Sequence, residues 1–156
     1  MWTLTHARDV AVGLVGLLGN EAAFGQAVNV MGDEALTWNG VHATIAAAAG
    51  LTVPQFAAIA IHVPSDAIVT ADPTLAGGVY GDKMHGAVFD TSRIRSLVPD
   101  FAPAVTFAQG MREALAWFGA NPERQTVDEE ANAMLDRLGR AYRTILRDFS
   151  ARAEAR

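Results

Sequence analysis

Residues 81–101 read GDKMHGAVFDTSRIRSLVPDF, and the rest of the chain is organised around this stretch. It holds Lys83, the single lysine of the protein, and His85 follows two residues later. A short apolar run then leads to Asp-Thr-Ser at 90–92, typical of a helix N-terminus, and Pro99 ends the short basic helix predicted there. An ammonium group suits a phosphate and an imidazole suits hydroxyl groups, so we interpret the stretch as a place to hold a polar ligand. The alternative is an exposed loop lysine beside a surface histidine.

The composition excludes several classes of protein. With 156 residues, 51% of them hydrophobic and 19% charged, the chain is expected to form one globular domain with a sizeable core. A net charge of −5 argues against nucleic acid as a partner. The absence of cysteine excludes disulfides, thiolate metal sites and cysteine nucleophiles. No apolar run is long enough for a membrane span, and the N-terminus lacks a basic signal-peptide region, so we expect a cytoplasmic protein.

Apolar periodicity and turn residues predict an α/β class, a small mixed fold with few short strands, several helices and a long C-terminal helix. Strands are predicted at 2–6, 26–31 and 57–63, and helices at 10–18, 38–49, 65–71, 93–97, 106–119 and 126–149. The expected N-caps are Thr37 and the first residues of two capping boxes, Thr106-x-x-Gln109 and Thr126-x-x-Glu129. Asp9 is expected at the N-cap or in the first turn of its helix, where its charge meets the positive end of the helix dipole.

Gly13-x-x-Gly16-x-x-Gly19 matches the glycine spacing of a dinucleotide-binding loop, and Asp33 lies twenty residues after Gly13. The surrounding pattern does not fit, because such a loop needs a strand before it and a full helix after it. We therefore favour a packed helix whose small residues permit close approach, and keep an NAD-binding protein as a third hypothesis.

Few residues point to catalysis or to a bound metal. The four histidines fall on separate predicted elements, without the pairwise spacing that a zinc or iron site uses. No Gly-x-Ser-x-Gly elbow is present, and a hydrolytic triad is not indicated.

A series of short motifs along residues 1–119 resembles the C-terminal half of the NAD-dependent epimerase/dehydratase family, the extended short-chain dehydrogenases. The motifs are Trp2-Thr3-Leu4-Thr5-His6-x-x-Asp9, Gly25-Gln26-x-x-Asn29-Val30, Leu36-Thr37-Trp38-Asn39, His62-Val63-Pro64-Ser65, Gly81-Asp82-Lys83-x-His85, Phe89-Asp90-Thr91-Ser92-Arg93-Ile94, Pro99-Asp100-Phe101 and Gly110-Met111-Arg112. Their order is more specific than any one of them.

The resemblance implies a substrate-binding lobe at 1–119, an additional C-terminal helix at 120–150 and a frayed tail at 151–156. In the family a separate N-terminal Rossmann half supplies the NAD or NADP site and a Tyr-x-x-x-Lys catalytic pair. Val79 stands four residues before Lys83, so this pair is absent, and we expect no catalytic residue and no bound cofactor in this chain. Trp2 and His6, together with Lys83 and His85, are implied to lie near a sugar or nucleotide-sugar substrate.

Two main hypotheses therefore stand. In the first, the chain is the substrate-binding portion of such an enzyme, inactive alone, and associates with a missing Rossmann half or with its own copies. In the second, it is a non-catalytic interaction module that self-associates through the helix predicted at 126–149.

Overall fold

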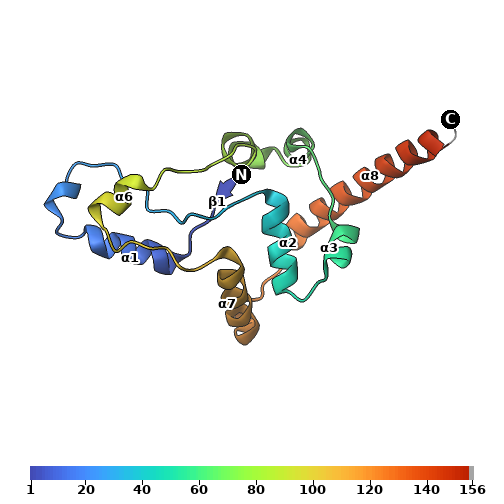
Figure 1. The fold of residues 1–156 in the computed structure, drawn as a ribbon. Coiled ribbons are helices and arrows are strands. Elements are labelled where there is room, and N and C mark those ends of the chain that lie inside the picture. The colour runs from blue at the N-terminus through green and yellow to red at the C-terminus, as the bar shows by residue number, and fades with distance from the viewer. Residues whose placement is uncertain (155–156) are drawn as a thin grey trace. The chain divides into compact units, whose positions relative to one another are not determined.

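The computed structural model describes the backbone of residues 1–154 and the side chains of residues 1–148 (Figure 1). Over this range the fold is mostly helical with two short antiparallel strands and a long C-terminal helix, and it confirms the predicted small mixed fold. The helices are α1 (Ala7–Leu17), α2 (Trp38–Ala48), α3 (Val53–Ile59), α4 (Ser65–Ala71), α5 (Ala76–Gly78), α6 (Ser92–Leu97), α7 (Phe107–Ala120) and α8 (Glu129–Glu154). The strands are β1 (Trp2–Thr3) and β2 (Ala35–Leu36), and the short helical turns are η1 (Glu21–Ala23), η2 (Pro73–Leu75), η3 (Val79–Lys83) and η4 (Pro122–Arg124).

The chain forms two compact units, each built from two separate segments. The first unit comprises residues 1–56 and 86–121, and the second comprises residues 57–85 and the chain from Pro122 onward. The chain therefore passes from one unit to the other after residues 56, 85 and 121. The division that the sequence suggested, near residue 119, lies close to the third of these points and does not include the first two. Each unit is described separately below.

In the first unit, the N-terminal strand is paired on two sides. β1 runs antiparallel to β2, with Trp2 opposite Leu36 and Thr3 opposite Ala35. On its other side Thr3 donates its backbone N–H to the carbonyl of Ala87 at 2.8 Å, and Ala87 donates to Met1 at 2.7 Å. The apolar run at 87–89 thus begins as an extended segment beside the N-terminus.

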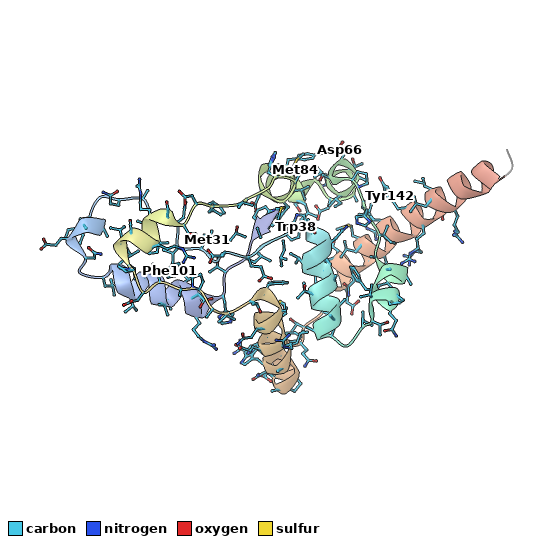
Figure 2. All side chains as sticks on the ribbon, viewed as in Figure 1. Met31, Trp38, Asp66, Met84, Phe101 and Tyr142 are labelled. Atoms are coloured by element: carbon cyan, nitrogen blue, oxygen red, sulfur yellow. The ribbon has the colours of Figure 1, made fainter. Side chains whose placement is uncertain are left out.

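The core of the first unit lies between α1 and α6 and is centred on Phe101 and Ile94, which are 2% and 0% exposed (Figure 2). Val98 completes the buried cluster, and partly buried residues of the 26–31 segment pack against it. Asp90 precedes Thr91, the N-cap of α6, and its carboxylate accepts the backbone N–H and the hydroxyl of Ser92 at the start of the helix. These two bonds lower the pKa of Asp90, the backbone bond most strongly.

Helices α2 and α7 pack against each other, and both begin as predicted. The Thr37 hydroxyl accepts the backbone N–H of Gly40 at 3.1 Å, and the Thr106 hydroxyl accepts that of Gln109 at 3.2 Å. Gly50 follows α2 with φ +87°, a left-handed conformation that suits glycine and ends the helix.

The strand predicted at 26–31 is wrong: the segment forms no regular element. Its alternation nevertheless has a structural cause, because Val28 and Val30 pack against the core beside α6. Arg93 holds the start of the segment by donating to the side chain of Gln26 and the carbonyl of Ala27. The segment is therefore held by side chains and not by a ladder of backbone hydrogen bonds, which a strand requires.

The strand predicted at 57–63 is also wrong. Residues 57–59 are the end of α3, and 60–64 have no regular structure. The N–H and the hydroxyl of Thr52 both donate to the Gln55 side chain at 2.8 Å, which is half of a capping box. With Pro54 in the first turn, Thr52-x-x-Gln55 was a helix signal that the strand prediction overlooked.

In the second unit, α4 packs against α8 and against η3. Arg143 of α8 donates to the carbonyls of Ala58 and Ile59 at 3.3 and 3.0 Å. Asp128, and not the predicted Thr126, caps α8 by accepting the N–H of Ala131.

On α8, Asp136 and Arg140, four residues apart, form an ion pair at 3.6 Å. The tail expected to fray at 151–156 belongs to α8 as far as Glu154, and residues 155–156 lie outside the described part. Through Glu154, no helix is long and apolar enough to cross a membrane.

Candidate functional site

Trp2, the first of the predicted substrate-binding residues, belongs to an aromatic row in the first unit. Its ring centroid lies 5.6 Å from that of Trp38, and the Trp38 ring lies 6.1 Å from the imidazole of His42. Nδ1 of His42 is 2.8 Å from the carbonyl of Trp38, one helical turn earlier. The row fixes the entry of α2 against β1 by aromatic packing.

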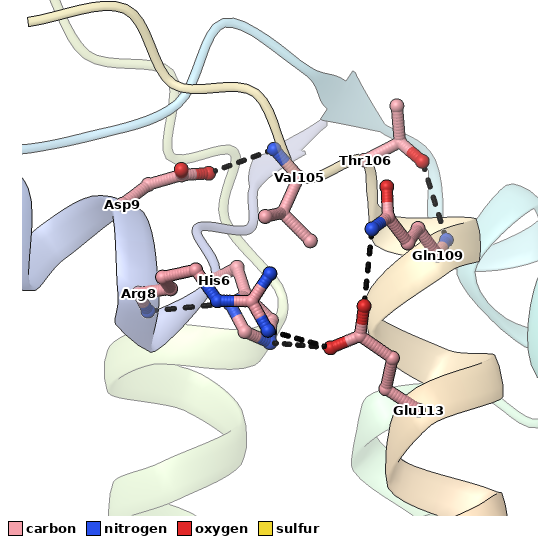
Figure 3. Close-up of polar contacts among 7 residues, drawn as sticks. All are labelled: His6, Arg8, Asp9, Val105, Thr106, Gln109 and Glu113. Atoms are coloured by element: carbon pink, nitrogen blue, oxygen red, sulfur yellow. Dashed lines mark hydrogen bonds and ion pairs between the residues drawn. The ribbon is translucent and has the colours of Figure 1, made fainter.

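His6 is the N-cap of α1, and its imidazole lies beside α7 (Figure 3). Nδ1 accepts the backbone N–H of Arg8 at 3.2 Å, which leaves Nε2 as the protonated nitrogen of the neutral ring. Nε2 is 3.9 Å from the carboxylate of Glu113, and a Cβ on Gly110 would lie 3.0 Å from the ring. His6 is thus held by a capping bond on one side and by α7 on the other.

Glu113 is the centre of a polar cluster around His6. Its carboxylate accepts from Gln109 at 3.0 Å and from Arg8 at 3.2 Å. The Gln109 hydrogen bond is the main reason that the pKa of Glu113 is lowered; burial opposes it, and the smaller effects of the Arg8 and His6 charges lower the pKa further. The cluster ties the N-terminus of α1 to α7 and keeps Glu113 ionised.

Asp9 is a buried carboxylate that connects α1 with the chain before α7 (Figure 3). It is 6% exposed, and its two oxygens accept the backbone N–H groups of Ala104 and Val105 at 3.2 and 3.0 Å. Its predicted place in the first turn is confirmed. Glu34 also accepts a backbone N–H near the start of α7, that of Phe107, at 2.7 Å.

These acids border a pocket of about 180 Å³ in the first unit. Its lining consists of Leu4, Thr5, Asp9, Gly32, Asp33, Glu34 and the segment Pro103–Thr106. Asp33 is already paired with Arg95 at 2.6 Å, and Asp9 is satisfied by backbone donors. The pocket offers oxygen acceptors, suited to hydroxyl groups, and no positive charge suited to phosphate.

A larger pocket of about 350 Å³ lies between α2 and α7. It is lined by Ala43, Thr44, Ala47, Ala48, Ala108 and Arg112. With mostly alanine walls, it provides a single charged group and little to orient a sugar ring.

The glycine motif is part of the core packing. Gly13 and Gly16 lie inside α1, and a Cβ at these positions would come within 2.5 Å of Val30 and 2.4 Å of Val98. Their backbone faces these neighbouring side chains, so a pyrophosphate could not approach it as it does in a dinucleotide-binding loop. These residues do not fit an NAD site.

In the second unit, Lys83 and His85 lie at the end of η3, which is a π-helical turn. Lys83 forms an ion pair with Asp82. Nε2 of His85 is 2.8 Å from the carbonyl of Tyr80, so this nitrogen carries the proton and donates. Nδ1 is then the acceptor nitrogen of the ring.

Tyr80 and Asp66 complete this polar turn. The Tyr80 hydroxyl donates to Asp66 at 2.9 Å, and this bond is the main cause of the raised pKa of Tyr80. Tyr80 therefore keeps its proton at neutral pH and serves as a hydrogen-bonding group, not as a base. We name Asp66, Tyr80, Lys83 and His85 the polar turn.

Sequence reasoning identified part of these clusters. Lys83 and His85 do lie in one turn, whereas Trp2 and His6 belong to the first unit and have different surroundings. Asp66 falls in the helix predicted at 65–71, and nothing in the spacing of 66 and 80 indicated their contact. Glu113 was not singled out either, although its place four residues after Gln109 on a predicted helix was a usable signal. Within the described part, no group of three His, Cys, Asp or Glu is arranged to hold a metal ion.

No protein-family profile matches the chain, and neither a curated protein nor a solved structure shows significant similarity to it.

Proposed function

We propose that this chain is the substrate-binding C-terminal portion of an NAD-dependent epimerase/dehydratase-like enzyme, and that it is inactive alone. The observation that carries the proposal is the second apolar face of α1. Between Val10 and Leu18 this helix contains no charged or polar side chain. A helix that is apolar on all sides is normally buried on all sides.

Only one face of α1 is covered by the first unit. Gly13 and Gly16 contact the core, whereas Val12, Val15 and Leu18 are 52%, 67% and 78% exposed. An exposed apolar patch of this kind is typical of an interaction surface. We propose that a Rossmann half, of the kind the resemblance implies, packs on it and brings the cofactor and the catalytic pair.

The polar turn supports the substrate part of the proposal. Lys83 is a cation for a phosphate, and the Nδ1 of His85 and the Asp66 carboxylate are acceptors for sugar hydroxyls. Lys83 and His85 lie at the end of η3, Asp66 is linked to η3 through its hydrogen bond with Tyr80, and all of these residues are exposed. In this proposal the polar turn binds and orients a nucleotide-sugar-like substrate.

The test is a calorimetric and thermal-shift titration of the purified chain with a panel of uridine and thymidine diphosphate sugars, NAD and NADP. A ligand that binds only the folded state raises the melting temperature by mass action. We expect a shift with at least one nucleotide sugar and none with NAD or NADP.

Alanine variants of the polar turn test whether the ligand binds there. Lys83→Ala and His85→Ala are expected to weaken nucleotide-sugar binding tenfold or more with little change in the melting temperature of the free protein. Arg124→Ala removes an exposed positive charge elsewhere in the second unit and serves as the control. A chain that binds no sugar, or that binds equally well without Lys83 and His85, overturns the proposal.

A further inference from the structure

Helix α8 has an apolar stripe that the second unit covers only in part. The stripe comprises Ala131, Met134, Leu135, Leu138, Tyr142, Ile145 and Leu146, which recur at helical spacing. Leu135 and Leu146 are each 57% exposed and Ile145 is 45% exposed. Such a stripe in water favours contact with another apolar surface.

Within the second unit α4 packs against α8, and the middle of the stripe is half-buried at Leu138 and Tyr142. A Cβ on Gly139 would lie 3.3 Å from Ile61, and Arg143 binds the carbonyls of Ala58 and Ile59. Leu135 lies before these contacts and Leu146 after them. The apolar positions at both ends of the stripe are therefore accessible to a partner.

Charge is divided along the same helix. Residues 128–136 contain four acidic residues and no basic one, whereas residues 137–148 contain four arginines and a single acid. A second copy aligned in parallel would place acid beside acid and arginine beside arginine. An antiparallel copy places each acidic end beside a basic end, and opposite charges beside a helix seam determine the orientation of the partner.

We infer that α8 pairs with α8 of a second copy in antiparallel orientation, with the two-fold axis near Leu138. In this register Ala131 lies level with Ile145 of the second copy, and Met134 lies level with Tyr142. A small side chain then faces a branched one, and Leu138 faces itself. The inference does not depend on the substrate proposed above.

The interface is small, so the dimer is expected to be weak. Pairing from Glu129 to Arg147 extends over about 28 Å of helix, which is the length of roughly three heptads. An interface of this size belongs to the transient class, and a dissociation constant on the order of 10 μM is expected. The dimer should weaken at high salt because part of its attraction is electrostatic.

The first test is sedimentation equilibrium of the whole chain between about 1 and 500 μM, a range that brackets the expected constant. Leu135→Glu and Leu146→Glu change exposed side chains of α8, so the monomer should fold, and dimer formation should fall at least tenfold. Val53→Glu introduces the same charge at an exposed apolar position of α3 and is the matched control. It should leave dimerisation unchanged.

Orientation is tested by cross-linking, which the absence of cysteine makes direct. Ala131→Cys and Ile145→Cys proteins are mixed and treated with a short bismaleimide. The antiparallel register predicts cross-links between the two different variants and few between identical copies.

Three results overturn the inference. One is a chain that stays monomeric up to 500 μM, and another is a dimer that the α8 variants leave intact but that Val15→Glu, on the exposed face of α1, abolishes. The third is preferential cross-linking of identical variants, which indicates parallel pairing. None of these results affects nucleotide-sugar binding, so failure here is separate from failure of the proposed function.

Discussion

The two units bury their side chains to very different extents. In the first unit Phe101 and Ile94 are almost inaccessible, and two glycines of α1 allow the chain to approach them closely. In the second unit none of the side chains described at 57–85 and 122–148 is buried. The apolar residues of α8 are therefore spread along a long helix and do not form a buried core.

This contrast indicates that the units are stabilised differently. Removal of apolar area from water is the dominant stabilising contribution to folding, and it is concentrated in the first unit around α1 and α6. The second unit depends on helix caps, exposed ion pairs and partly covered apolar side chains, each of which contributes little. Long helices with little tertiary packing are marginal alone, so α8 should gain most from a partner.

The largest expected effect is that of removing the centre of the first core. Phe101→Ala should lower the free energy of unfolding by about 3–5 kcal/mol, because the cavity cannot collapse fully. Tyr142→Ala, at a half-buried position of α8, should cost clearly less. Both are measured by urea denaturation at low micromolar concentration, with the exposed Phe24→Ala as the control. If Phe101→Ala and Tyr142→Ala lower the free energy of unfolding equally, the two units do not differ in how strongly burial stabilises them.

Three glycine-to-alanine substitutions in helices distinguish the effect of packing on stability from the effect of helix propensity. Alanine gains about 1 kcal/mol over glycine in an open helix, and Gly119→Ala in α7 should show this gain because its Cβ meets nothing within 4 Å. Gly16→Ala should instead lose about 1–3 kcal/mol, since its Cβ would overlap Val98. Gly139→Ala in α8 meets only the end of the Ile61 side chain, which can move, and should be near neutral or stabilising. A stabilising Gly16→Ala contradicts the packed-helix interpretation.

Asp9→Asn tests the polar anchor of the first unit. The amide retains a single acceptor oxygen and turns an N–H donor toward the backbone donors of Ala104 and Val105. A loss of about 1–3 kcal/mol is expected, as for other buried groups left unsatisfied. Asp33→Asn, which breaks only the exposed pair with Arg95, should cost less than about 1 kcal/mol. The two variants are compared by urea denaturation at pH 7.

The smallest effect concerns pH and the Glu113 cluster. The folded-state pKa of Glu113 lies below its unfolded value, chiefly because of the Gln109 hydrogen bond. Its contribution to stability is therefore fully present above the unfolded pKa and is lost as pH falls through the folded pKa. Glu113→Gln should flatten the decline of the melting temperature between about pH 5 and pH 3. An unchanged slope means that Glu113 has equal pKa values in both states.

Local signals in the sequence predicted much of the helical structure. Thr37 and Thr106 cap the helices that they were expected to cap, Gly50 ends α2, and Asp136 pairs with Arg140. These features depend on residues three or four positions apart, so nearby sequence contains the necessary information. The error at 126 has the same basis, since Asp128 stood two residues away as an equally good cap.

The strands could not be predicted in this way. The alternating run at 26–31 marks an extended segment with one face on a core, but a strand also needs a neighbour that completes its hydrogen bonds. At 57–63 the apolar run was too short to distinguish a strand from the end of a helix. The pairing of β1 with residues 35–36 and with Ala87 joins positions more than thirty residues apart, so no local pattern contains it.

The sequence alone determined most of the helical segments, the caps at Thr37 and Thr106, the charge division along α8 and the absence of cysteine chemistry, because each is a property of composition or of short spacing. The tertiary structure decided the rest. It placed Gly13 and Gly16 against Val30 and Val98, so the glycine motif serves helix packing and not phosphate binding. It also joined Tyr80 to Asp66 and gathered the buried side chains into one unit, since long-range contacts and burial arise only when distant segments meet.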